Sequence, residues 1–402
     1  MSEEITQSAV APPRPKAPLW LLGVLTFSGT LAMHIFVPAL PVAAISLGVG
    51  IPAMQATISL YILGLAFGQL IYGPVSDRFG RRPTLMVGLV IYTIAGFAAV
   101  FAADIQTLIV ARLFQALGGC AGLVLARAMV RDTSESKDAV RRQALMNLMV
   151  TLAPGIGPLV GGLVANTAGW RALLALLCGL GVVNFLLTWR LLPETGRPSR
   201  RAGTGLLRSY GYLARSPAFL GFAIGGGCAT TSMYAFIAAA PFIFLRELHR
   251  SPDEVGPYVS ILIFGVWIGS MLASRLIARV PIRRLLIGAN SVSVIATLVF
   301  LAAVLTGHLS VVLTIVTMFV FTVGVGTAAP AALTEAISVD PAVIGSASGL
   351  YGFTQMAVGA LCTALVGFGG SPSLAAALVL TGAGIVAQAA FWIAARSQAR
   401  ST

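Results

Sequence analysis

Residues 73–83 read Gly-Pro-Val-Ser-Asp-Arg-Phe-Gly-Arg-Arg-Pro, a polar turn between two apolar stretches. The turn holds one acid, Asp77, among three arginines, and its two glycines allow close helix approach. The flanking stretches, 55–75 and 84–103, each have about 20 mostly apolar residues, enough for a helix to cross a bilayer. The sequence around the turn therefore predicts two membrane-spanning helices joined by a tight connection whose ion pairs can break and re-form.

The composition of the whole chain agrees with a membrane protein. Hydrophobic residues make up 57% of the 402 positions and charged residues 10%. A soluble domain has about 45–50% apolar and about 25% charged residues, so soluble globular folds are excluded. The four cysteines have no paired spacing, and we therefore expect no disulfide framework, no metal site and no cofactor.

Twelve apolar stretches predict an all-α polytopic membrane protein. They fall at residues 19–43, 55–75, 84–103, 106–129, 144–166, 170–192, 218–245, 255–278, 285–306, 310–333, 343–368 and 373–395. An even number of spans leaves both termini on one side of the membrane. The expected organisation is an N-terminal tail (1–18), a six-helix bundle (19–193), a flexible polar linker (194–217) and a second six-helix bundle (218–396).

The basic residues indicate the orientation. The net charge of +13 comes from short runs of Arg and Lys between the apolar stretches, a pattern typical of membrane topology and not of nucleic-acid binding. With a cytoplasmic N-terminus, only Arg171, Arg246 and Arg250 fall in the outer connections, and the other basic residues outside the helices fall on the inner side. Both termini and the linker are therefore expected in the cytoplasm.

The two halves of the chain resemble each other in sequence. In the first helix of each half, four residues recur at an offset of 200: His34, Phe36, Ala39 and Pro41 correspond to Tyr234, Phe236, Ala239 and Pro241. In the second helix, three recur at an offset of 197: Tyr61, Gly68 and Arg78 correspond to Tyr258, Gly265 and Arg275. Parallel repeats with a binding site between them, near the middle of the membrane, are typical of rocking transporters.

The fourth predicted helix carries a charge inside the membrane. Arg112 and Gln115 lie on one face of this helix with Gly119, Gly122 and Ala126. A charge at the bilayer centre costs about 2.5–3.5 kcal/mol on insertion scales, so Arg112 is expected to face protein or a water-filled cavity. The alternative is that its long side chain reaches the membrane surface, roughly 9 Å away.

The fifth predicted helix combines prolines and glycines in residues 153–162, Ala-Pro-Gly-Ile-Gly-Pro-Leu-Val-Gly-Gly. Gly157 and Gly161 form a GxxxG pair for close helix packing, and Pro154 and Pro158 bend the helix. Gly162 completes the motif. Generic packing of small residues is the alternative reading, but it does not explain the doubled Gly-Pro pattern.

These motifs resemble those of the major facilitator superfamily. The resemblance implies a major facilitator fold with two six-helix bundles in a bacterial inner membrane. It also implies a latch that holds one state of the transport cycle, formed by the gate motif Gly73, Asp77, Arg78, Gly80, Arg81 and Arg82. It further implies proton coupling at Arg112 and, from the antiporter motif in 153–162, export rather than uptake.

A narrower resemblance covers nearly the whole chain, with helices 1–5 the most specific. Residues 34–41, 61–64, 68–74 and 127–132 look like those of the bicyclomycin and chloramphenicol resistance exporters, the Bcr/CflA type of drug–proton antiporter. That type usually has an aspartate where this chain has His34, and the other acids near the membrane, Asp104 and Glu335, stand at helix ends. His34 is thus the candidate for proton coupling with Arg112, or else a packing residue.

The function expected from the sequence is secondary active export of small, mostly hydrophobic drugs in exchange for protons. Transport of a metabolite such as an amino acid, sugar or nucleoside is the alternative. Candidates for lining the substrate cavity are Phe36, Tyr61, Gln115, Asn147, Tyr234, Phe236 and Gln355. No GxxxxGK[ST] loop for an ATP-driven pump occurs, and the helices lack the convergent acids and nucleophiles of an enzyme. The expected partners are a small-molecule substrate, protons and lipid, with the chain acting as a monomer.

Overall fold

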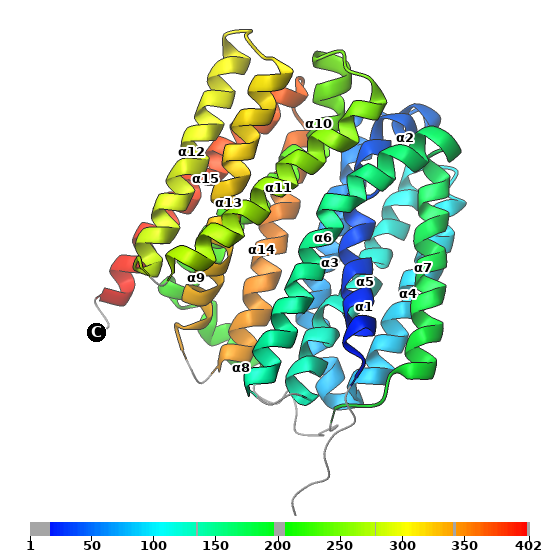
Figure 1. Ribbon diagram of the computed structural model, residues 1–402, viewed down its shortest axis with the longest axis vertical. Helices are drawn as coiled ribbons and strands as arrows, with labels where there is room; N and C mark the ends of the chain where they lie inside the picture. The colour runs from blue at the N-terminus through cyan, green and yellow to red at the C-terminus, as the bar shows by residue number, and fades with distance from the viewer. Residues whose placement is uncertain (1–16, 134–135, 197–205, 278, 341–342, 400–402) are drawn as a thin grey trace, which may run out of the picture.

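The computed structural model describes residues 17–133, 136–196, 206–277, 279–340 and 343–399. Across these ranges the chain is α-helical, without a strand. Figure 1 shows two groups of long helices side by side, one from the first half of the chain and one from the second. The expected all-α fold with two six-helix bundles is confirmed.

The N-terminal bundle begins with a broken helix, because Pro38 and Pro41 interrupt regular hydrogen bonding. This first span consists of α1 (Leu19–His34), the short 3₁₀ helix η1 (Val37–Ala39) and α2 (Leu40–Ser46). The remaining helices of the bundle are α3 (Ile51–Phe79), α4 (Arg81–Val100), α5 (Ile105–Thr133), α6 (Ser136–Ala168) and α7 (Trp170–Leu191).

The C-terminal bundle also begins with a broken helix. Its first span consists of α9 (Pro217–Thr231), α10 (Met233–Phe242) and a π-helical turn, η2 (Ile243–Glu247). The other helices are α11 (Pro252–Leu276), α12 (Ile282–Leu305), α13 (Val311–Ile337), α14 (Ile344–Gly367) and α15 (Pro372–Ala399). The predicted spans agree with the observed helices to within four residues, except that α6 begins at Ser136, eight residues before the predicted start at 144.

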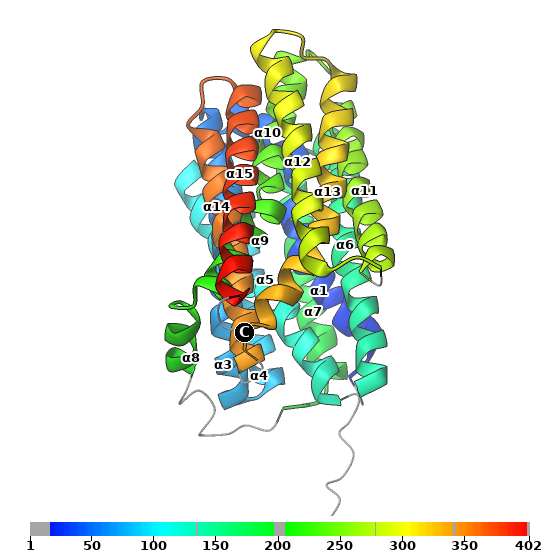
Figure 2. The ribbon, with the colours of Figure 1, turned by 90° about the vertical axis from the view of Figure 1, so that its left-hand side faces the viewer.

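Eleven helices in the described part of the chain are long and apolar enough to cross a membrane, counting each broken helix as one. The twelfth span is α6, whose apolar part is Leu152–Ala168. We call the end of the molecule with α2 and the turn between α6 and α7 the α2 end. The opposite end, with α8 (Leu206–Leu213) and the turn between α3 and α4, is the α8 end (Figures 1 and 2).

The two bundles contact each other through α3 with α14 and through α6 with α11. Phe67 of α3 and Phe353 of α14 have ring centroids 5.8 Å apart. Between α6 and α11, the Ser260 hydroxyl donates to the Gly155 carbonyl at 3.0 Å, and Asn166 donates to Asp253 nearer the α2 end. These two helix pairs make most of the contact between the bundles, so any relative motion of the bundles must alter them.

The glycine contacts correct the predicted repeat register in the second helix. A Cβ on Gly64 would lie 2.6 Å from the Leu113 carbonyl oxygen, and a Cβ on Gly265 would lie 2.9 Å from the Phe319 carbonyl oxygen. Gly64 therefore corresponds to Gly265, at an offset of 201 (64 to 265), not 197. The two offsets differ by four residues, about one helical turn, which keeps every residue on the same face and hides the difference in the sequence.

The predicted linker, residues 194–217, is not uniformly flexible. It contains α8, whose Leu213 is fully buried and whose Tyr210 hydroxyl faces Gly349 of α14. Residues 197–205 lie outside the described part of the chain. The division into a bundle of residues 19–193 and a bundle of residues 218–396 stays our proposal, with α8 placed between them.

Candidate transport site and gate

Arg112 lies in the middle of the N-terminal bundle, where α5 brings it against α1 and α3. Its side chain is fully buried. One guanidinium nitrogen, Nη1, donates to Gln115 Oε1 at 2.7 Å, and Nη2 donates to the Ala32 carbonyl of α1 at 2.7 Å. Arg112 is therefore enclosed by protein and does not extend to the membrane surface.

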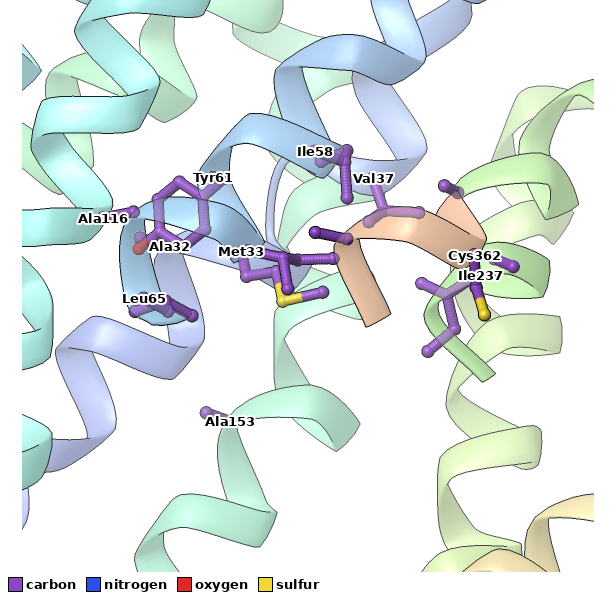
Figure 3. Packing of buried hydrophobic residues seen from close by; sticks show 14 of the residues in the cluster. Ala32, Met33, Val37, Ile58, Tyr61, Leu65, Ala116, Ala153, Ile237 and Cys362 are labelled. Atoms are coloured by element: carbon purple, nitrogen blue, oxygen red, sulfur yellow. The ribbon is translucent and has the colours of Figure 1, made fainter. Parts of the chain in front are cut away.

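Two aromatic rings complete the surroundings of Arg112. The guanidinium carbon lies 4.3 Å from the ring centroid of Tyr61 and 5.2 Å from that of Phe36. The Tyr61 hydroxyl is fixed by a 2.9 Å hydrogen bond to the Gly29 carbonyl. Figure 3 shows Tyr61 in the cluster that also contains Ala32. Dipoles and π faces thus stabilise the buried cation, and each of these described neighbours is neutral.

His34 stands at the end of α1, where the two bundles meet. Its Nδ1 hydrogen donates to the Thr30 carbonyl at 2.9 Å, which leaves Nε2 as an acceptor, and this atom has no partner in the described part of the chain. Its ring meets Tyr234 of α10 edge-on, with centroids 6.0 Å apart. His34 and Arg112 therefore have different neighbours, and the described contacts do not join them directly.

The antiporter motif lies where α6, a helix of the N-terminal bundle, contacts both the first span and α11 of the other bundle. A Cβ on Gly161 would lie 2.1 Å from the Ile35 carbonyl oxygen, and one on Gly157 would lie 3.0 Å from His34 Cβ. On the other side, a Cβ on Gly256 of α11 would lie 2.7 Å from the Pro158 carbonyl oxygen.

The remaining motif residues fit the same arrangement. Gly162 faces Gly256, whose Cα would lie 3.9 Å from an added Cβ. Pro154 and Pro158 are both inside α6, as the sequence predicts. The small residues of the motif therefore let α6 touch the break of the first span and a helix of the other bundle at once.

The gate motif lies at the α8 end. Arg81 is its centre, with an ion pair to Asp77 at 2.6 Å, a second to Asp132 of α5 at 2.9 Å, and a hydrogen bond to Ser76. Gly80 has a φ of 98°, which favours glycine and turns the chain sharply from α3 into α4.

The other gate residues have separate roles. The Arg82 Nη2 group donates to the Trp189 carbonyl at 2.6 Å, while Arg78 stacks on Phe79 at 5.3 Å. Gly73 sits in the last turns of α3 with open space where a side chain would be. Of the three arginines in the gate motif, only Arg81 forms an ion pair that joins two helices in the described part of the chain.

Sequence reasoning missed the roles of Asp132 and Glu194. Glu194 accepts hydrogen bonds from the backbone N–H groups of Arg81 (3.0 Å) and Arg82 (3.1 Å), at the positive N-terminus of α4. Because the chain has only 13 acids, any acid on the same side of the membrane as the arginine-rich turn is a candidate partner. The small number of acids was therefore the feature of the sequence that could have pointed to Asp132 and Glu194.

The predicted cavity residues divide into two groups. Phe36, Tyr61 and Gln115 are buried around Arg112, and Phe236 is buried against Phe300, with centroids 5.8 Å apart.

The second group lies near the bundle interface. Tyr234 is partly exposed beside His34. Gln355 of α14 is also partly exposed, and it donates to the Thr230 hydroxyl at 2.8 Å. The side chain of Asn147 lies outside the described residues.

The two acids nearest the membrane interior remain at helix ends. Asp104 precedes α5 and accepts hydrogen bonds from the Thr107 backbone and hydroxyl, both at 2.8 Å. These bonds hold the pKa of the Asp104 carboxyl below its usual value, so Asp104 stays ionised at neutral pH. Glu335 lies in the last turn of α13, near Arg283. A carboxylate proton carrier within the membrane is therefore not found at either position.

Comparisons with known proteins agree with this architecture. The chain is 34% identical over 263 residues to Multidrug resistance protein D of Escherichia coli strain K12, a match covering 64% of the chain and 65% of that relative. It is 24% identical over 357 residues to a Bicyclomycin resistance protein homolog of Haemophilus influenzae, covering 86% of the chain and 87% of the relative.

The fold also matches solved transporter structures. The crystal structure of a D-xylose-proton symporter superposes with a TM-score of 0.75 at 15% identity, over 93% of this chain and 96% of that one. The family model described as Major Facilitator Superfamily matches residues 22–363. With two six-helix bundles, a charged turn after the second span and this match over most of its length, the chain belongs to the Major Facilitator Superfamily.

Proposed function

We propose that this transporter exports small, mostly hydrophobic drugs in exchange for protons. The observation that carries the proposal is the position of the antiporter motif. Through Gly161 and Pro158, α6 contacts both the break of the first span and α11 of the other bundle. The names of two relatives, which refer to multidrug and bicyclomycin resistance, support drugs as the substrates.

In the proposed mechanism the two bundles rock against each other around a site between them. At the α2 end, the contacts of α6 with α11 would have to open and close. At the α8 end, the Asp77–Arg81–Asp132 network holds the turn between α3 and α4 against α5 and would act as the latch. Arg112 and His34 would carry the coupling to protons.

The proposed orientation places both termini and α8 in the cytoplasm, in a bacterial inner membrane. Single cysteines in a cysteine-free background, probed on intact cells with an impermeant thiol reagent, test it. Position 50, before α3, should react, and position 204 should react only after the cells are opened. The reverse labelling pattern would contradict the orientation.

A drug-susceptibility panel in cells that lack their own pumps tests the function. Expression should raise the inhibitory concentration of several hydrophobic drugs. Everted vesicles should accumulate the same drugs when they are acidified inside, and an uncoupler should abolish this. One charge moving through 100 mV supplies about 2.3 kcal/mol, enough for a gradient of roughly 45-fold of a neutral drug. Accumulation that survives collapse of both the pH gradient and the potential would refute proton antiport.

A further inference from the structure

The acidic residues that the structure describes stay at the ends of the membrane-spanning helices. They lie in helix-terminal turns or in connections: Asp77, Asp104, Asp132, Asp138, Glu194, Glu247, Asp253, Glu254, Glu335 and Asp340. Within the described part of the chain, a cationic ligand in the middle of the membrane would therefore meet no carboxylate. Because desolvation makes an uncompensated charge costly, such a ligand would depend on dipoles and aromatic rings alone.

The same region holds a positive charge that no carboxylate balances. Arg112 is fully buried, and its described partners are the Gln115 amide, the Ala32 carbonyl and two aromatic rings. Arginine stays protonated in proteins, so the cluster keeps a net charge of +1. Hydrogen bonds to neutral groups stabilise this charge without cancelling its field.

The guanidinium of Arg112 lies close to the interface between the bundles. Its guanidinium binds the carbonyl of Ala32, two residues before His34, and two residues of helix rise about 3 Å. His34 meets Tyr234 of the other bundle with ring centroids 6.0 Å apart. The 2.7 Å hydrogen bond to Ala32, this rise and the 6.0 Å between the rings place a molecule bound between the bundles near these two rings on the order of 10 Å from the guanidinium.

From this charge distribution we infer that the transporter takes neutral and anionic compounds and rejects cationic ones. The inference rests on the proposed drug export and specifies the substrate class of that same site. A unit charge about 10 Å from another, at an effective dielectric constant near 20, changes affinity by roughly tenfold. Two ligands of the same shape and opposite charge should therefore differ by about a hundredfold.

Tetraphenylborate and tetraphenylphosphonium are the probes, because they have nearly the same size and opposite charges. Equilibrium binding is measured on the purified full chain in nanodiscs of zwitterionic lipid, with binding to empty nanodiscs subtracted. The borate should bind at least tenfold more tightly than the phosphonium ion. Equal binding, tighter binding of the phosphonium ion, or no specific binding of either ion overturns the inference.

Variants assign the preference to Arg112. Arg112→Gln should bring the ratio of the two affinities close to one. Gln115→Glu places a carboxylate beside the guanidinium and should remove the preference even if Arg112→Gln does not fold. Arg171→Gln is the matched control, because it removes a positive charge that stacks on Trp170 near the α2 end, and it should keep the preference. A preference that persists in folded Gln115→Glu protein contradicts the role of Arg112.

The drug panel separates this inference from the proposed function. If no compound of any charge is exported, the proposed function fails. If neutral compounds are exported and cationic compounds of similar hydrophobicity are exported equally well, the function holds and the charge inference fails. Export of neutral and anionic compounds only supports both.

Discussion

The same close helix contact occurs in both bundles, between α4 and α5 in one and between α12 and α13 in the other. A Cβ on Gly118 would lie 2.5 Å from the Gly88 carbonyl oxygen, and one on Gly324 would lie 2.7 Å from the Ala289 carbonyl oxygen. At this offset of 206 residues (118 to 324), Arg112 corresponds to Met318, which is also buried. The packing is repeated, and the buried charge is not.

The ion pairs that join the start of α4 to the end of α5 and the start of α12 to the end of α13 also differ between the bundles. In the N-terminal bundle, Arg81 at the start of α4 pairs with Asp132 at the end of α5 at 2.9 Å. In the C-terminal bundle, Arg283 at the start of α12 pairs with Glu335 at the end of α13 at 3.4 Å, with a more exposed arginine. The two halves therefore share their helix packing, while the buried arginine and the less exposed of the two ion pairs lie in the first half.

The largest effect is expected when Arg112 is replaced by methionine, the residue type at the corresponding position 318 of the C-terminal bundle. Arg112→Met should nearly abolish energised transport in everted vesicles, because it removes the buried charge while keeping an apolar side chain of related length. Arg112→Lys should retain part of the activity. Met318→Leu is the matched control and should transport at close to the normal rate. Full transport by well-expressed Arg112→Met would show that the two bundles do not divide their roles in this way.

The glycine contacts predict equal effects in both bundles. Gly118→Ala and Gly324→Ala place a Cβ within 2.7 Å of backbone atoms that cannot move independently, so each should lower stability by about 1–3 kcal/mol. Gly179→Ala and Gly288→Ala, one in each bundle, have open space and should leave the melting temperature unchanged or slightly raised. Thermal unfolding of the purified variants measures this. A large loss in only one bundle would break the structural equivalence.

Removing one acid from each ion pair should reduce turnover by a smaller amount, and unequally in the two bundles. Asp132→Asn leaves the largely buried Arg81 with a weaker partner and should reduce turnover several-fold, with little change in ligand affinity. Glu335→Gln affects a pair whose arginine side chain is 42% exposed, and such pairs contribute about 0–1 kcal/mol, so its turnover should fall less than twofold. Initial rates in vesicles decide between them, and equal losses would count against a one-sided latch.

The change at His34, where the bundles touch, is expected in the pH profile. His34→Gln keeps a hydrogen-bonding side chain and cannot titrate, so transport should lose most of its dependence on pH between 5 and 8. Tyr234→Phe, which alters the facing ring without a titratable group in that range, should keep the normal pH profile. An unchanged profile in His34→Gln would remove His34 from the proton pathway and leave it a packing residue.

Hydrophobic length and charge placement predicted the spans, because each helix must bury about 20 apolar residues in lipid whatever its neighbours are. The burial of Arg112 also followed from the cost of a charge in the membrane. The sequence could not predict that Phe36 and Tyr61 stack on Arg112, since both also fit an open cavity. It missed Asp132 and Glu194 as partners of the gate because their contacts join segments 51 and 113 residues apart. Such long-range pairs depend on how helices pack, which no local pattern specifies.

The hydrogen bonds of Glu194 have a practical consequence for dividing this protein into fragments. Glu194 follows α7, yet it satisfies the backbone N–H groups that open α4 and also accepts from the Gly196 backbone at 2.7 Å. If the gene is split before residue 194, Glu194 belongs to the second fragment, and the backbone N–H groups at the start of α4 in the first fragment lose their acceptor. A split after residue 196 keeps the cap with its own bundle. Two co-expressed half-transporters divided there should reassemble, whereas fragments divided a few residues earlier should assemble less well.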